Sequence, residues 1–68
     1  LFEEAARFII ESNNASTSSL QRRWSIGYAR AGRLMDQLQM AGIVGPSQGG
    51  KPRQILMDIF QLNQFIEK

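Results

Sequence analysis

The sequence predicts a small, mostly α-helical fold of the α+β class, with three helices, a β-hairpin and an added C-terminal helix. Apolar residues recur at helical spacing over residues 1–12, 18–42 and 58–68. Between the last two segments, residues 43–57 place short β-prone runs around a tip rich in glycine and proline, the pattern of a hairpin. Three helices and a hairpin in this order are typical of a winged helix-turn-helix, and 68 residues suffice for one such domain.

The composition excludes several classes of function. The chain has no cysteine and no histidine, which removes disulfides, zinc fingers and the usual catalytic base. It shows no acid–base pair, metal cluster or activated nucleophile, so we expect a binding domain without enzyme activity, metal or cofactor. No apolar run is long enough to cross a bilayer, and no signal peptide is apparent. We therefore expect a cytoplasmic domain without direct membrane contact. Because it starts without methionine, we expect a fragment of a longer protein.

The first helix is predicted over residues 1–12. Its apolar residues fall at i, i+3, i+4, i+7 and i+8, which is one stripe of a helix, and Ser12, Asn13 and Asn14 end it. This helix is expected to be scaffold. The stripe consists of Phe2, Ala5, Ala6, Ile9 and Ile10.

The second helix is predicted to start near Ser19 and to end at Trp24. Ser18 followed by Gln21 fits a capping box, and residues 15–17 fit a short edge strand. Backbone N–H groups and serine hydroxyls at a helix start can also hold a DNA phosphate, so Ser18 and Ser19 are candidates for that contact. Trp24 is expected in the core, although an indole can also stack on a base.

The third helix is predicted from Tyr28 to Met40. Gly27 is expected to supply the turn before it, and Gly42 a left-handed cap after it. Helical spacing sends one set of residues to the core: Ala31, Leu34, Met35 and Leu38.

The opposite face of this third helix is predicted to contact DNA bases. Positive charge is concentrated here, because residues 20–42 carry four arginines and one acid while residues 1–19 carry one arginine and three acids. Arginine pairs with guanine, and an acid can accept from cytosine. Gly32 costs helix stability and is interpreted as a place of close approach to another helix or to DNA. An ordinary charged surface helix is the alternative. The predicted base contacts are Ala29, Arg30, Arg33 and Asp36.

The hairpin is predicted from β-prone runs at 43–44 and 55–57, with Lys51 and Arg53 at its tip and on its returning strand. There they would meet the DNA backbone or minor groove. A nucleotide-binding loop is excluded, because the Walker pattern is absent and no helix follows. The full set predicted for the DNA backbone or wing is Ser18, Ser19, Arg22, Arg23, Tyr28, Gly50, Lys51 and Arg53.

The last segment, residues 58–68, is predicted to be a helix with Asp58 as its N-cap. Its apolar residues are too numerous for a solvated tail. We expect it to pack on the first helix or complete the core, with self-association as the alternative.

The run LQRRWSIGYARAGRLMDQLQMAGIVGPSQGGKPRQIL resembles the C-terminal γ domain of FtsK/SpoIIIE-type bacterial DNA translocases. Members of that family typically contain LQRRFRIGYxRAARLID, then GIVGP, a glycine-rich tip and KPREVL. The resemblance covers the chain from about Phe2 to Met57. It implies a winged helix that binds double-stranded DNA at short, G-rich, polar chromosomal sequences. That binding would orient a hexameric translocase during chromosome segregation and cell division.

The resemblance also implies partners and a location. These are a XerD-type recombinase that the γ domain activates, the other subunits of the hexamer reached through a missing ATP-driven motor domain, and a parent protein anchored in the inner membrane at the division septum. A domain used mainly for protein interaction, with its arginines on an acidic partner such as the recombinase, is the alternative function.

Five positions match functional positions of the family, namely the arginines and acid of the recognition helix and the basic residues of the wing: Arg30, Arg33, Asp36, Lys51 and Arg53. Three positions depart from it. Ser25 stands where arginine is common, Ala29 replaces a polar residue, and Gly32 replaces alanine. Ala29 can still contact a thymine methyl group.

Overall fold

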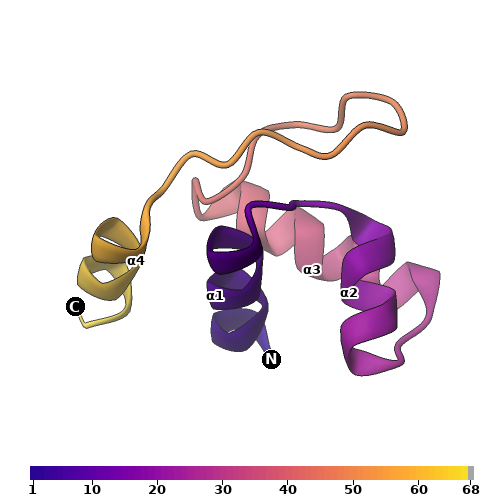
Figure 1. Ribbon diagram of the computed structural model, residues 1–68, viewed down its shortest axis with the longest axis horizontal. Coiled ribbons are helices and arrows are strands. Elements are labelled where there is room, and N and C mark those ends of the chain that lie inside the picture. Colours follow the sequence, from indigo (N-terminus) through magenta and orange to yellow (C-terminus); the bar gives the residue numbers. More distant parts are fainter. Residues whose placement is uncertain (68) are drawn as a thin grey trace.

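The computed structural model describes residues 1–67 and is mostly helical (Figure 1). In Figure 1, α1 stands between α4 on one side and α2 on the other, while the segment between α3 and α4 passes over the helices. The helices of the described residues are α1 (Phe2–Ser12), α2 (Thr17–Trp24), α3 (Tyr28–Met40) and α4 (Ile59–Ile66).

The core extends through the packed helices, with α1 against both α3 and α4 and with α2 against α3, and it confirms the apolar stripes predicted from the sequence. The predicted core residues of α3 are all buried, as are three members of the α1 stripe; the other two are half-buried. Trp24 also packs as predicted, with its ring edge-on to Phe8 at 5.4 Å between ring centroids. The buried core residues are Ala5, Ala6, Ile9, Ala15, Leu20, Ala31, Leu34, Met35, Leu38, Ile43, Val44 and Leu62.

The start of α2 differs from the prediction, because Ser16 rather than Ser18 is its N-cap. The Ser16 backbone is extended (φ −113°, ψ 144°), and its hydroxyl oxygen accepts a hydrogen bond from the Ser19 N–H at 3.2 Å. The helix therefore begins at Thr17, two residues earlier than predicted. The chain has serines at 16, 18 and 19, and helical spacing alone does not decide which of them caps.

The turn between α2 and α3 also differs from the prediction. Gly27 is extended (φ −73°, ψ 165°), a conformation open to any residue, whereas Ser25 takes the left-handed conformation (φ 53°). The chain is thus redirected where α2 ends, two residues before the glycine.

The end of α3 follows the prediction. Gly42 is left-handed, with φ 81°. Its N–H donates to the Gln39 carbonyl and the Ile43 N–H donates to the Leu38 carbonyl, each at 3.0 Å, which is the Schellman arrangement.

The predicted β-hairpin is only partly formed. The chain doubles back after α3 (Figure 1), but the described residues there form isolated antiparallel bridges and no continuous strand. Glycine and proline interrupt the tip, and proline has no N–H for a ladder. Residues 45–53, called loop 45–53 below, span this tip. Its base is closed by two backbone hydrogen bonds of 2.8 Å, from the Gly45 N–H to the Gln54 carbonyl and from the Leu56 N–H to the Ile43 carbonyl.

The last helix, α4, packs on α1 as predicted. Asp58 and Gln61 form a capping box, since each side chain accepts from the other's backbone N–H at 2.8 and 2.9 Å. Leu62 is buried in the core, and the Arg7 guanidinium donates to the Asn63 side-chain oxygen at 3.0 Å. The helix was predicted to run to residue 68, but it ends at Ile66, and residue 68 itself lies outside the described residues.

Candidate nucleic-acid interface

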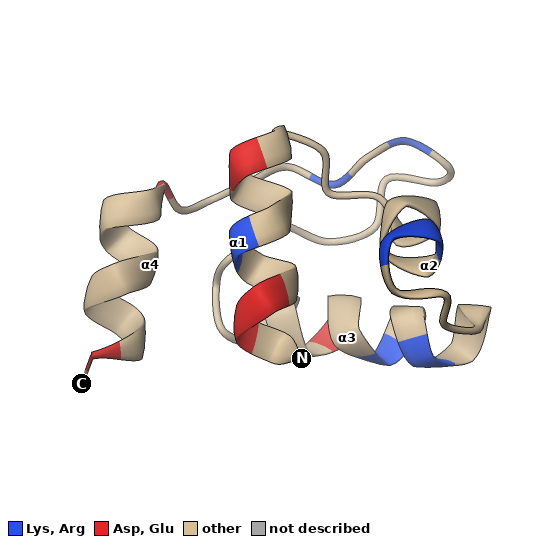
Figure 2. Ribbon diagram, turned by 60° about the horizontal axis from the view of Figure 1, so that its bottom comes forward, with Lys and Arg blue, Asp and Glu red and all other residues tan. Residues whose placement is uncertain are grey.

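The outer face of α3, defined by Ala29, Arg30, Arg33 and Asp36, is exposed to solvent. These residues lie opposite the buried stripe of the same helix. Figure 2 shows the arginines of α3 as neighbouring blue bands, with the acidic residue further along the helix in red. In the described part of the chain, the Arg30 and Arg33 guanidinium groups have no hydrogen bond or ion pair. They are therefore free to meet an external acceptor.

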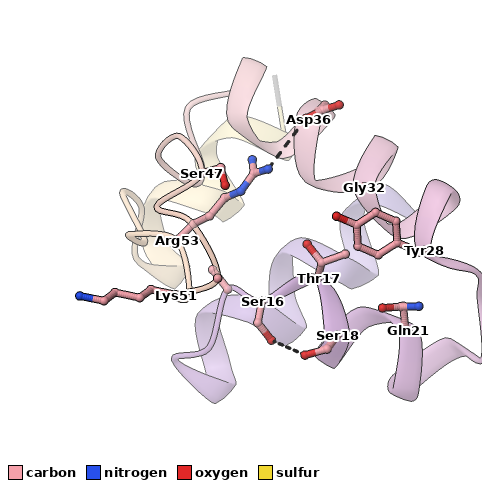
Figure 3. A pocket seen from close by; sticks show the side chains of 12 residues that line it. Ser16, Thr17, Ser18, Gln21, Tyr28, Gly32, Asp36, Ser47, Lys51 and Arg53 are labelled. Carbon is pink, nitrogen blue, oxygen red and sulfur yellow. Dashed lines mark hydrogen bonds and ion pairs between the residues drawn. The ribbon is translucent and has the colours of Figure 1, made fainter.

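A groove of about 470 Å³ runs beside this face, between the start of α2, one edge of α3 and loop 45–53 (Figure 3). Its walls are mostly hydroxyl, amide and charged side chains. Lys51 extends from the loop away from the helices in Figure 3. The groove is lined by Ala15, Ser16, Thr17, Ser18, Gln21, Tyr28, Gly32, Asp36, Ser47, Gly50, Lys51 and Arg53.

The predicted residues divide between the two edges of α3. The first edge, on the groove, carries Tyr28 and Asp36. Arg30 and Arg33 line a separate hollow beyond the other edge, together with Leu1 and other residues near the amino terminus. Helix α3 therefore carries two cations along one edge and a hydroxyl and a carboxylate along the other.

The two arginines of α2 lie on different sides of that helix. Arg22 is four residues after Ser18 and so shares its exposed side. The Arg23 guanidinium lies over the Trp24 ring, 5.1 Å from its centroid, and lines a hollow with residues of α1. Arg23 thus faces α1 and is not part of the groove.

Ser19 does not fit the predicted phosphate contact. Its side chain is buried, and its hydroxyl oxygen accepts hydrogen bonds from the Asn14 side-chain amide at 2.9 Å and from the Ser16 hydroxyl at 2.8 Å. Its backbone N–H is taken by the cap. Because Ser16 is the N-cap, Ser19 occupies the third position of α2, where its side chain is buried. That prediction is wrong, while Ser18 is exposed in the groove.

Arg53 is held within the fold rather than extended from the wing. Its side chain is only 14% exposed, and its guanidinium lies 3.9 Å from the Asp36 carboxylate. It also approaches the Met35 carbonyl at 3.4 Å and the Gln39 side-chain oxygen at 3.3 Å. The sequence suggested separate roles for Asp36 and Arg53. Their pairing depends on how the chain returns after α3, and residue spacing carries no signal for it.

Some groove residues were not among the predicted contacts, notably Thr17 and Gln21 on α2. The predicted cap at Ser18 put Thr17 outside the helix and assigned Gln21 to the capping box, so neither was placed among the DNA contacts.

Among residues 1–67, no cluster of acidic residues is suited to a metal ion. Over the same residues, no helix has the length and apolar character to cross a membrane.

Comparison with known proteins bears on this arrangement. The sequence profile of the family described as the Ftsk gamma domain matches residues 1–58. The chain belongs to this family. The resemblance noted from the sequence is thereby confirmed, and it covers the helices α1 to α3, the groove and loop 45–53.

The relatives of this γ domain are named DNA translocase FtsK. That of Staphylococcus epidermidis is 56% identical over 59 residues, or 87% of this chain. Those of Chlamydia muridarum and Halalkalibacterium halodurans are 54% and 53% identical, over 87% and 84% of the chain. The chain spans only 7% of the length of each of these relatives.

Proposed function

We propose that this γ domain binds double-stranded DNA with sequence preference, and so orients a hexameric translocase on short, G-rich, polar chromosomal sequences during chromosome segregation and cell division. The observation that carries the proposal is the pair Arg30 and Arg33. Both are exposed and without partners within residues 1–67. They lie in the first half of α3, the part of a recognition helix that usually meets base edges.

In the proposed complex the domain acts as a winged helix. Its α3 enters the major groove, where arginine can pair with guanine O6 and N7, and Ala29 can meet a thymine methyl group. Loop 45–53 serves as the wing, with Lys51 against the phosphate backbone. Ser18, Arg22, Tyr28 and Gly50, beside or within the groove, supply further backbone contacts.

The wider setting is proposed from the relatives, which are named DNA translocases. The γ domain supplies the DNA preference, and an ATP-driven motor elsewhere in the parent protein supplies movement. The domain itself needs no cofactor for this role. We place the parent protein in the inner membrane at the division septum, with a XerD-type recombinase as a further partner of the γ domain.

The test is a selection from random duplex DNA, followed by affinity measurements at several salt concentrations. The wild-type domain is expected to enrich a G-rich sequence. Arg30→Ala and Arg33→Ala are each expected to lose about 1–3 kcal/mol of discrimination between bases. Arg23→Ala is the matched control, since it removes the same charge from the side of α2 that faces α1. Its affinity is expected to change less than about twofold.

Two outcomes would contradict the proposal. One is negligible affinity for any duplex at low salt, and the other is unchanged sequence discrimination in both arginine variants. If these variants instead lose binding to a XerD-type recombinase while DNA binding is absent, the alternative function as a protein-interaction domain is supported.

A further inference from the structure

We propose that Arg53 is a positioning residue, which fixes loop 45–53 against α3 and orients Asp36 without contacting DNA itself. The effect on DNA binding rests on the proposed function. The clamp itself, meaning the contacts that join Arg53 to α3 and to Ala15, is present in the free protein. The first observation is how little of the Arg53 side chain is exposed to solvent. The Arg53 side chain is 14% exposed, whereas its ion-pair partner Asp36 is 71% exposed and Lys51, two residues away, is exposed in solvent.

Arg53 joins three segments of the chain. Its backbone N–H donates to the Ala15 carbonyl at 2.9 Å, which ties the loop to the linker between α1 and α2. Its guanidinium group reaches α3 at three points: the Met35 carbonyl, the Gln39 side-chain oxygen and the Asp36 carboxylate. In Figure 3 the Arg53 side chain points from the loop toward Asp36, and Lys51 points the other way.

These contacts are the principal fastening of the loop. Within residues 1–67, the Gly45 N–H bond to Gln54 closes the base of loop 45–53, and every other hydrogen bond that links the loop to another part of the fold involves Arg53. The remaining hydrogen bond within the loop, from the Lys51 N–H to the Gly49 carbonyl, is local. The Arg53 side chain is therefore the direct link between the tip that carries Lys51 and α3, while backbone hydrogen bonds hold the base of the loop and its contact with Ala15.

The chemistry of the contact requires arginine. The planar guanidinium presents donors in several directions at once, whereas a lysine ammonium is a single compact charge. Three acceptors on one helix can therefore be met by a guanidinium group but not by a single ammonium group. A side chain so engaged has few donors left for a phosphate, while Asp36 keeps most of its surface available to a base.

The first experiment measures amide hydrogen exchange without DNA. Arg53→Gln is expected to speed exchange at residue 53 by about tenfold, the factor that corresponds to loss of roughly one hydrogen bond. Lys51→Gln is the matched control, because it removes a charge from the same loop without removing a contact, and its exchange is expected to be unchanged. Arg53→Lys is expected to behave like Arg53→Gln. Unchanged exchange in Arg53→Gln, or full protection in Arg53→Lys, would overturn the proposal.

The second experiment measures DNA affinity against salt. Each phosphate contact contributes about 0.9 to the slope of log affinity against log salt. Lys51→Gln is expected to flatten the slope by that amount, whereas Arg53→Gln is expected to weaken binding at an unchanged slope. A flattened slope in Arg53→Gln would show a direct phosphate contact and overturn the proposal. If the wild-type domain binds no duplex, the proposed function fails, and the exchange experiment still decides whether Arg53 is the clamp.

A third measurement connects the clamp to base preference. Asp36→Asn is expected to change the preferred DNA sequence in the wild-type background and to change it less in the Arg53→Gln background, because contacting residues couple. Additive effects of the two substitutions would contradict the claim that Arg53 orients Asp36. Gln39→Ala removes one acceptor at an exposed position and is expected to raise loop exchange in the same direction but by a smaller factor.

Discussion

Replacing Gly32 by alanine is expected to stabilise the fold. Gly32 is the fifth residue of α3, within the helix rather than at its cap. An ideal β-carbon built there meets no atom within 4 Å among the described residues. The added methyl group therefore meets no clash, and the usual advantage of alanine over glycine in a helix interior, about 0.8–1 kcal/mol, should be gained in full.

A gain of about 1 kcal/mol in the free energy of unfolding corresponds to a rise in Tm of about 4–8 °C for a domain of this size. Thermal unfolding followed by circular dichroism measures it. Gly42→Ala is the matched control, since that glycine has φ +81° and also no atom near an added β-carbon. There the left-handed backbone opposes a side chain by roughly 1–2 kcal/mol, so Tm is expected to fall.

A Tm for Gly32→Ala equal to or below that of the wild type would refute this reasoning. The same variant tests why glycine is present. The sequence suggested close approach to another helix or to DNA, and the empty surroundings exclude the helix. If the glycine serves DNA binding, Gly32→Ala melts higher and binds DNA more weakly, because residue 32 lines the groove beside the outer face.

Three further predictions concern individual side chains. Ser16→Ala is expected to lower the free energy of unfolding by about 1 kcal/mol through loss of the α2 cap. Ser18→Ala should change it by less than about 0.5 kcal/mol, and urea denaturation giving equal effects would contradict the observed cap. Leu62→Ala is expected to cost about 2–5 kcal/mol in the same assay because it empties a buried site. Phe60→Ala, at a position 75% exposed, should cost little; a small loss in both would mean that α4 is not fastened to the core. Lys51→Ala should weaken binding to all DNA sequences alike, by titration, and a change confined to one sequence would argue for a base contact.

The helices could be predicted from the sequence because burial imposes a period. Ala31, Leu34, Met35 and Leu38 recur at helical spacing, and the structure buries each of them. The left-handed residue after α3 was predictable as well, because glycine lacks a β-carbon and so adopts positive φ readily at the end of a helix. The left-handed Ser25 was not, since a serine carries no such signal and the conformation follows from how α2 meets α3.

In the candidate site, too, some residues could be placed from the sequence and others could not. The exposed face of α3 follows from the position of its core stripe, so Arg30 and Arg33 could be placed in advance. The environments of Ser19 and Arg53 could not. The first depended on a choice among neighbouring serines, and the second on a contact between residues 36 and 53 that only the folded loop brings together.

The position of the amino terminus has a practical consequence for anyone who labels this domain. Leu1 lines the same hollow as Arg30 and Arg33, and Figure 2 shows the N-terminal end beside α3. An affinity tag or fluorophore fused there would sit next to the arginines, and an acidic tag would compete for them. The end of α4 lies on the far side of α1 (Figure 1) and offers a fusion site remote from the outer face.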